Sequence, residues 1–120
     1  MSIEKAKDWL RQFGADGRVL EFDTSSATVE LAAQAVGCEA ARIAKTLSFR
    51  TNDGVILIVA AGDVKIDNPK YKARFGCKAK MLSFDEVEPE IGHAVGGVCP
   101  FGVNEGVTVY LDEALHRFET

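Results

Sequence analysis

The residues of this sequence that could do chemistry lie in two places that are far apart in the chain. The first is Lys45, the charged residue in the run 43–49 (I-A-K-T-L-S-F), where apolar and polar side chains alternate. A strand places residues two apart on one face, so Lys45 would share its face with Leu47 and Phe49. Burying an ammonium group without a partner is costly. Lys45 must therefore reach solvent along its aliphatic stem, meet an acid, or face a site that receives an anion.

The second place is the segment 96–102 (G-G-V-C-P-F-G), which combines three glycines with a proline. Glycine reaches backbone conformations that are closed to other residues and lets other atoms come close. Such a loop can direct backbone N–H groups at the oxyanion that develops during acyl transfer. Clusters of glycine and proline also form ordinary turns. The segment therefore predicts a candidate site and leaves its chemistry open.

His93 and Cys99 offer a third kind of chemistry. A cysteine nucleophile needs its thiolate and an imidazole within hydrogen-bond reach, and proximity in sequence neither provides nor excludes that contact. The plainer interpretation is that His93 is a loop residue near a pocket and Cys99 a small side chain lining it. With Cys38 and Cys77 the cysteines are odd in number and lack a C-x-x-C pair, which indicates neither a disulfide framework nor a zinc site.

Charge is unevenly distributed along the chain. The net charge is −4, but the window 65–80 holds six basic residues against the single acid Asp67, a local charge of +5 that leaves −9 on the rest. Clustered lysine and arginine bind phosphates whatever the overall charge, which predicts local contact with a polyanion. A solvated basic helix face is the alternative. The basic residues are Lys65, Lys70, Lys72, Arg74, Lys78 and Lys80.

Periodicity and turn signals predict the elements that position these residues. Helices are predicted where apolar residues recur at three- and four-residue spacing, and strands where they alternate or form short runs. The hairpin of 43–49 and 55–61, joined by the turn 51–54, is expected to bury its second strand on both faces. The predicted helices are 3–13, 29–36 behind the cap-rich 24–26, 69–75, 85–90 and one that begins at 112; the other predicted strands are 18–22, a short one near 81–84, and 107–111.

This order of elements predicts an α+β protein with a mixed sheet flanked by helices. A length of 120 residues without repeat or linker predicts one domain over 1–120. Apolar residues make up 47% and charged residues 27% of the chain, values typical of soluble globular proteins. Because no apolar stretch is long enough for a membrane span or signal peptide, and unpaired cysteines fit a reducing compartment, we expect a cytoplasmic location.

Four short segments, taken in order, resemble the signature of the YbaK/ProX family, relatives of the editing domain inserted in bacterial prolyl-tRNA synthetase. The resemblance runs from about Ser25 to the C-terminus. No single segment is specific, but four in the same order with matching gaps are. The segments are 44–47 (A-K-T-L), 59–63 (V-A-A-G-D), 96–102 and 109–112 (V-Y-L-D).

The resemblance implies a partly barrel-like mixed sheet and a trans-editing hydrolase that deacylates mischarged aminoacyl-tRNA, typically tRNA for proline carrying alanine or cysteine. It implies neither a metal nor an organic cofactor. The expected partner is aminoacyl-tRNA, with an aminoacyl-tRNA synthetase as a further one; neither a membrane nor DNA is expected.

The resemblance also implies roles for individual residues. The lysine of the family's K-T-L motif falls on Lys45 and lines the substrate pocket, with Thr46 beside it. The family's glycine-rich loop falls on 96–102, and its backbone shapes the site around the aminoacyl carbonyl. The loop residues expected to shape the site are Gly96, Gly97, Pro100 and Gly102; those expected to contact substrate are His93, Val98, Cys99 and Phe101. The basic residues of the window 65–80 would bind the tRNA acceptor stem.

Two departures limit what the resemblance implies. The position of Cys99 varies among relatives and is expected to help set specificity, so the amino acid removed does not carry over. Relatives usually continue well past the position of Asp112, so this chain is expected to be either naturally short or truncated at its C-terminus. Two other functions stay open: a non-catalytic module that binds tRNA, amino acid or nucleotide, and a hydrolase that uses Cys99 and His93. The sequence does not give the oligomeric state.

Overall fold

The structure, a computed structural model, describes residues 2–24 and 28–119. Three strands are interspersed with α-helices and with short 3-10 helices, which are labelled η. In chain order the elements are α1 (Ser2–Arg11), η1 (Asp16–Arg18), α2 (Val29–Val36), η2 (Ala40–Arg42), β1 (Ala44–Thr51), β2 (Gly54–Ala61), α3 (Asn68–Phe75), α4 (Phe84–Ile91), β3 (Thr108–Leu111) and η3 (Glu113–Arg117). Within the described residues, no helix is long and apolar enough to cross a membrane.

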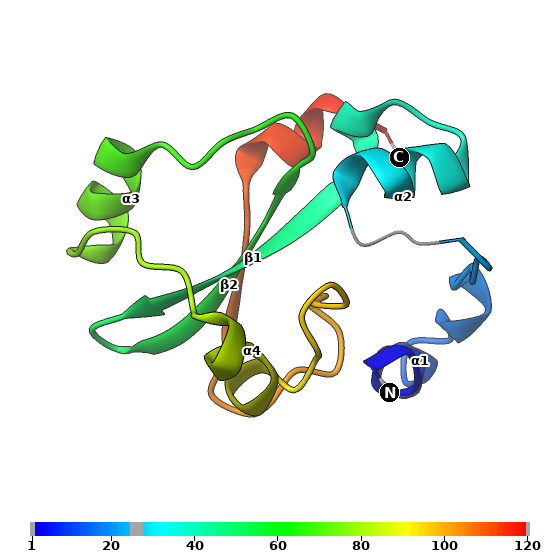
Figure 1. The fold of residues 1–120 in the computed structure, drawn as a ribbon, viewed down its shortest axis with the longest axis horizontal. Helices are drawn as coiled ribbons and strands as arrows, with labels where there is room; N and C mark the ends of the chain where they lie inside the picture. Colours follow the sequence, from blue (N-terminus) through cyan, green and yellow to red (C-terminus); the bar gives the residue numbers. More distant parts are fainter. Residues whose placement is uncertain (1, 25–27, 120) are drawn as a thin grey trace.

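The three strands form one mixed sheet with β2 in its centre (Figure 1). β1 and β2 form the predicted antiparallel hairpin, in which Lys45 lies opposite Ala60. β3 runs parallel to β2, with Val109 opposite Leu57. Residues 55–61 of β2 are all buried, as expected for a strand covered on both faces. The mixed sheet and its flanking helices confirm the predicted α+β class.

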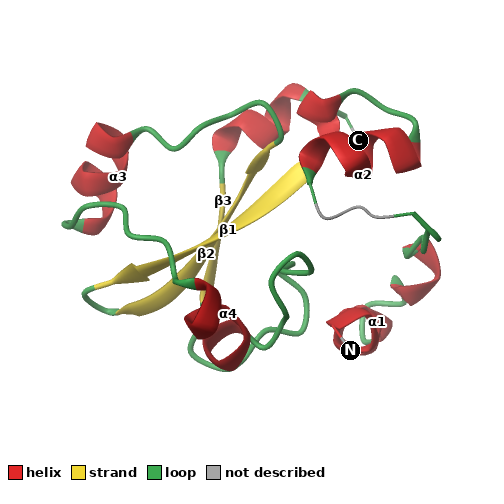
Figure 2. Ribbon diagram, viewed as in Figure 1, coloured by secondary structure: helices red, strands yellow, loops and turns green. Residues whose placement is uncertain are grey.

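The two faces of the sheet carry separate hydrophobic cores, because α3 lies on one side of the strands and α4 on the other (Figure 2). The core on the α4 side consists of Val55, Leu57, Leu82, Val87 and Ile91. The core on the α3 side consists of Phe49, Ile56, Ile58 and Tyr71. Val98 of the glycine-rich segment and Val103, which directly follows it, pack against the first core, so the segment lies on the α4 side.

Local signals fix the ends of the helix that borders the site. Thr28 caps α2 by accepting a hydrogen bond from the Leu31 amide at 3.1 Å. Gly37 ends α2 in the left-handed conformation, with φ of 82°, as the sequence predicts. The predicted cap residues Ser25 and Ser26 lie outside the described residues.

The strand predicted over 18–22 is wrong. Residues 16–18 form η1, and residues 19–22 have no regular structure. Leu20 and Phe22 are exposed, so this apolar run is not buried in either core. A strand needs a neighbour to satisfy its backbone groups, and the sheet of the described residues consists of β1, β2 and β3 alone.

Two further elements are shorter or tighter than predicted. The strand expected near 81–84 reduces to a single bridge between Met81 and Phe49. The helix expected from Asp112 is the 3-10 helix η3, in which the Asp112 carboxylate accepts a hydrogen bond from the Ala114 amide at 3.0 Å. The basic helix and the acidic helix are confirmed as α3 and α4, each within a residue or so of the predicted bounds.

Candidate functional site

A cleft of about 590 Å³ opens between β1, the start of α2, the start of α4 and the glycine-rich loop. Its volume is in the range of pockets that bind small organic ligands. Most of its wall is apolar. The lining residues are Thr28, Val29 and Ala32; residues 43–48; Met81, Leu82, Phe84 and Val87; and Val95, Gly96 and Val98. The two segments singled out in the sequence, the run around Lys45 and the glycine-rich loop, therefore border one cleft.

The pleat of β1 divides its side chains between the two faces of the sheet. Ser48 lies opposite Leu57, a member of the core under α4, so Thr46 and Ser48 face the cleft side. Phe49 belongs to the core under α3, so Lys45 and Leu47 point to the opposite face. Within the described part of the chain, the Thr46 and Ser48 hydroxyls have no hydrogen-bond partner. Two hydroxyls on the cleft side of β1 thus remain available to a ligand.

The Lys45 ammonium is held by the turn that follows β2. Its Nζ donates a short hydrogen bond to the Val64 carbonyl and a longer one, at 3.4 Å, to the Gly62 carbonyl. The side chain is half-buried, and among the described residues it forms no ion pair with an acid. Two backbone carbonyls satisfy the ammonium in this state. An anionic ligand would have to compete with them for the lysine.

The turn 62–64 is itself held in place from two sides. Gly62 lies so close to the Ala40 carbonyl and to the Val29 side chain that a Cβ atom would not fit. Arg117 of η3 binds Asp63 through both carboxylate oxygens, at 2.5 and 3.2 Å. The hydrogen bond from Arg117 lowers the pKa of Asp63 below its ordinary value. The acceptors of Lys45 therefore sit on a firmly packed turn.

The glycine-rich loop presents backbone donors beside the cleft. Gly96 has φ of 86°, a left-handed conformation that favours glycine. The Gly97 amide is occupied, because it donates to the Ala94 carbonyl at 2.9 Å. Among the described residues, the Gly96 and Val98 amides have no acceptor, and both residues line the cleft. Oriented amides of this kind are suited to stabilising an oxyanion.

His93 and Cys99 come together underneath the loop. Sγ of Cys99 lies 3.6 Å from Nε2 of His93, and the imidazole is fully buried, 0% exposed. Nε2 is also 2.6 Å from the Phe101 carbonyl, an acceptor, so Nε2 carries the hydrogen and donates it there. Burial raises the pKa of the Cys99 thiol. The Cys99 thiol faces a ring nitrogen that already carries a hydrogen, so His93 cannot take the thiol's proton through Nε2. This geometry therefore does not favour the nucleophilic dyad.

The expected site residues of the loop are therefore placed in different ways. Gly96 and Val98 line the cleft, whereas Gly97 does not. His93, Cys99 and Phe101 contact one another and do not line the cleft. Pro100 and Gly102 likewise do not line the cleft. Gly102 packs against α1 so closely that an added Cβ atom would lie 2.6 Å from the Lys5 carbonyl oxygen. These residues can shape the loop from below.

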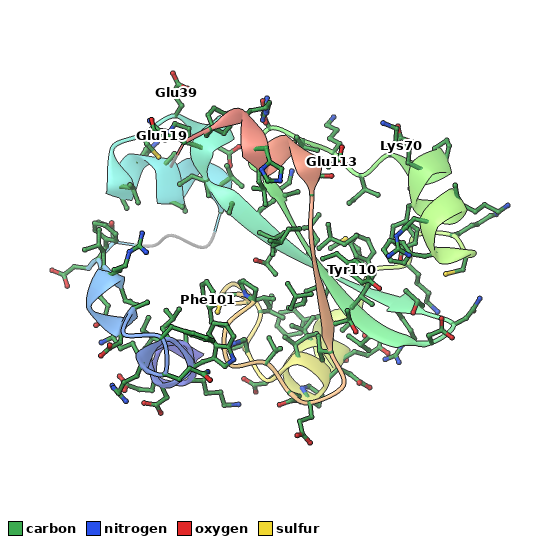
Figure 3. All side chains as sticks on the ribbon, turned by 180° about the vertical axis from the view of Figure 1, so that it is seen from behind. Glu39, Lys70, Phe101, Tyr110, Glu113 and Glu119 are labelled. Atoms are coloured by element: carbon green, nitrogen blue, oxygen red, sulfur yellow. The ribbon has the colours of Figure 1, made fainter. Side chains whose placement is uncertain are left out.

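The basic residues of the window 65–80 lie away from the cleft wall. α3 packs on the other face of the sheet through Tyr71, and the Arg74 guanidinium lies 5.2 Å from the Tyr110 ring centre. Figure 3 shows Lys70 on α3 and Phe101 in the loop in separate parts of the molecule. Lys80 is exposed and directly precedes Met81, which lines the cleft. The basic window thus approaches the cleft through its last residue.

Several cleft residues escaped the sequence analysis. Ser48 could have been found, since it stands two residues after Thr46 in an alternating strand and so shares its face. Phe84 had no such signal. It is the first residue of α4, lines the cleft and is 78% exposed, whereas an apolar residue at this position would be expected in the core. Thr28, the N-cap of α2, follows the cap-rich stretch 24–26 and has no sequence signal of its own that would assign it to a site. Within the described residues, no group of three His, Cys, Asp or Glu side chains could hold a metal ion.

Comparison with known proteins gives a consistent set of relatives. The sequence pattern of the "Aminoacyl-tRNA editing domain" family matches residues 23–120. The uncharacterized protein YwhH of Bacillus subtilis is 54% identical over 121 residues, which cover 100% of this chain and 77% of YwhH. A proline--tRNA ligase of Limosilactobacillus fermentum is 28% identical over 112 residues, 88% of this chain but 20% of the ligase.

Solved structures agree with these sequence matches. A crystal structure described as a candidate trans-editing enzyme for prolyl tRNA synthetase superposes with a TM-score of 0.85 and 33% identity, over 98% of this chain and 75% of that one. The hypothetical protein APE2540 superposes with a TM-score of 0.82 and 26% identity, over 95% of this chain and 77% of that one.

Proposed function

Because this chain belongs to the aminoacyl-tRNA editing domain family, we propose that its cleft hydrolyses the ester joining a wrong amino acid to the 3′ end of a tRNA. The observation that carries the proposal is the composition of the cleft wall. It combines an apolar surface, two hydroxyls on β1 and the unpaired amides of Gly96 and Val98. An aminoacyl ester needs an apolar place for its side chain and donors for its carbonyl oxygen.

The chemistry suits a site without a strong nucleophilic side chain. A synthetase discriminates against an amino acid lacking one methylene by only about 1–3 kcal/mol, so later hydrolysis has to supply the remaining accuracy. Water attacks the ester carbonyl, with the neighbouring ribose hydroxyl positioned to take part in the proton transfer. The bond between the carbonyl carbon and the ribose oxygen then breaks, the ribose oxygen leaves with a proton, and the free amino acid is released. The Gly96 and Val98 amides stabilise the oxyanion in the transition state. Thr46 and Ser48 orient the acyl group or the attacking water.

Lys45 and the basic window serve the nucleic-acid part of the substrate in this proposal. On substrate binding, Lys45 gives up its hydrogen bonds to the Gly62 and Val64 carbonyls and binds the terminal adenosine or its phosphate. The phosphate carries a full charge and is therefore a stronger acceptor than a carbonyl. Lys80 lies beside the rim of the cleft, and the other basic residues of 65–80 extend from there towards α3, where they bind the acceptor stem.

We further propose a cytoplasmic protein in which residues 1–120 form one editing domain that works without a cofactor. The match to proline--tRNA ligases supports tRNA for proline, carrying a small wrong amino acid such as alanine or cysteine, as the substrate. A synthetase is the expected partner, since the domain would act on tRNA that the synthetase has released.

Release of amino acid from a panel of aminoacyl-tRNAs tests the proposal. We expect hydrolysis of at least one mischarged tRNA above background, and loss of most of that activity in Lys45→Ala. Arg18→Ala, which removes an exposed cation that does not line the cleft, is the matched control and should keep full activity. Saturable tRNA binding without ester cleavage would instead indicate a binding module. Inactivation by iodoacetamide and by Cys99→Ser would indicate the cysteine-dependent hydrolase.

A further inference from the structure

Helix α1 contacts the rest of the protein at the glycine-rich loop 96–102 and at Gly92, which precedes the loop. The Lys5 ammonium donates a hydrogen bond to the Gly92 carbonyl at 2.8 Å. The Trp9 ring packs against the Phe101 ring, with 5.3 Å between ring centres and an angle of 33° between the ring planes. Among the described residues, every other side-chain hydrogen bond, ion pair or ring contact of α1 stays within residues 2–24.

The backbone also fits closely at this contact. Gly102 has φ of 68°, and an added Cβ would lie 2.6 Å from the Lys5 carbonyl oxygen. The helix and the loop therefore meet where glycine alone leaves enough room. Ala6 on the same helix is buried, which shows that α1 is seated on the protein and not merely tethered to it.

The loop is held from the inside by a second anchor. His93, which is fully buried, donates its Nε2 hydrogen to the Phe101 carbonyl at 2.6 Å. Phe101 is thus fixed through its carbonyl by His93 and through its ring by Trp9. Residues 96 and 98, which present the unpaired amides, lie between these anchors and Gly92 in the chain. A loop fixed at both ends holds its amides in one orientation.

We propose that α1 is a brace for the glycine-rich loop, with Lys5 and Trp9 as positioning residues that hold the Gly96 and Val98 amides in place. The inference rests on the proposed function, because the amides matter only if an oxyanion forms beside them. It goes beyond the family match, which begins at residue 23 and leaves α1 out. Residues of α1 touch the loop and do not line the cleft.

The brace has a kinetic signature. Amides that stabilise an oxyanion act in the transition state, so loosening the loop lowers kcat and leaves KM nearly unchanged. Misplacement of catalytic groups by a fraction of an ångström to an ångström costs on the order of tenfold to a hundredfold in rate. We expect Trp9→Ala to lower kcat on the order of tenfold, and Lys5→Met to lower it less. Trp9→Phe keeps a ring against Phe101 and should restore most of the loss.

The control is Phe13→Ala, which removes an aromatic ring from the same N-terminal segment. Phe13 contacts Trp9 at 4.9 Å between ring centres, is exposed, and has no ring contact with the loop. Hydrogen–deuterium exchange of the peptide covering residues 92–103 is measured for all four variants in the full-length chain. Exchange there should rise in Trp9→Ala and Lys5→Met, with the strands unchanged, and should stay at the wild-type level in Phe13→Ala.

Exchange and turnover together separate failure of the brace from failure of the proposed function. If exchange rises as expected but the wild type hydrolyses no aminoacyl-tRNA, the loop is braced and the function is wrong. If the wild type is active but Trp9→Ala leaves exchange and kcat unchanged, the brace is overturned. Equal effects of Phe13→Ala and Trp9→Ala also overturn it, since they would reflect loss of α1 as a whole.

Discussion

The two faces of β1 contribute to the candidate site in different ways. On the cleft face, the Thr46 and Ser48 hydroxyls have no partner among the described residues, and the same holds for the Gly96 and Val98 amides of the loop that borders the cleft. On the other face, the Lys45 ammonium is already bound by the Gly62 and Val64 carbonyls. Adjacent residues of one strand thus differ in their hydrogen bonding: the hydroxyls are available to a ligand, whereas the Lys45 ammonium already donates to two backbone carbonyls.

Residues that are adjacent in sequence therefore need not have the same role. The pleat sends Lys45 and Thr46 to opposite faces of β1, but β1 lies at the edge of the described sheet and both residues border the cleft, so one ligand at this edge can reach both. The cleft face is suited to the ester and the lysine to the nucleotide that carries it. A single substrate with two chemically distinct parts would use both faces.

The largest effect is expected on the lysine face, from Gly62→Ala. The new Cβ would collide with the Ala40 carbonyl, a backbone group that cannot move aside cheaply, and would press on Val29. We expect the free energy of unfolding to fall by about 3 kcal/mol in urea denaturation. Gly17→Ala is the control, because its Cβ meets open space at an ordinary φ. A stability equal to that of the control would show that the turn 62–64 is not a firm support for Lys45.

Next in size is Gly102→Ala on the loop. Gly102 combines a left-handed φ of 68° with the close Lys5 carbonyl, so alanine is both strained and crowded. We expect a loss of about 2 kcal/mol in the free energy of unfolding, together with reduced hydrolysis. Gly106→Ala, at φ of 87° with open space around it, carries the strain alone and should cost about 1 kcal/mol. Equal losses of free energy of unfolding in Gly102→Ala and Gly106→Ala would show that α1 does not crowd the loop at Gly102.

Thr46→Val tests the cleft face with a change that conserves shape. The Thr46 hydroxyl has no partner among the described residues, so its removal should leave the free energy of unfolding nearly unchanged. Loss of one hydrogen bond to a ligand costs about 1 kcal/mol, which corresponds to a several-fold fall in kcat/KM. Thr108→Val, at an exposed position of β3, should change neither quantity. Full activity of Thr46→Val would assign the cleft hydroxyls no part in the reaction.

The smallest effect concerns Arg50, the last cleft-side residue of β1, which pairs with Glu86 of α4 at 2.8 Å. Hydrogen bonds from the Ser83 backbone and from Arg50 lower the pKa of Glu86 from 4.5 to about 2. A lowered folded-state pKa means that the stabilisation is complete above pH 4.5 and is lost as the pH falls towards 2. Urea midpoints measured between pH 7 and pH 2.5 should therefore fall less for Glu86→Gln than for wild type. A parallel fall would contradict the pairing.

The sequence was informative about elements and about the members of the site, and less so about their partners. Alternation placed Lys45 on the face of Leu47 and Phe49, which the register confirms. It could not identify the Gly62 and Val64 carbonyls, because backbone acceptors in a turn have no side-chain signature.

Long-range contacts were the other missing part. The sequence predicted the helix over 3–13 but not its seat on the loop, since contacts between Lys5 and Gly92 or Trp9 and Phe101 join segments far apart in the chain. The failed strand over 18–22 has a related cause: its residue types suit a strand, but only the assembled sheet determines whether a partner strand is present.

Titration of the full-length protein with a non-hydrolysable aminoacyl-adenosine, followed by amide chemical shifts, shows whether the cleft binds the aminoacyl end of a tRNA. We expect saturable shifts at Thr46, Ser48, Gly96 and Val98, with a weaker response at Gly62 and Val64 as Lys45 changes partner, and none at Tyr71 of α3. Shifts confined to α3, or no shifts at the cleft with ligand in large excess, would contradict binding in the cleft.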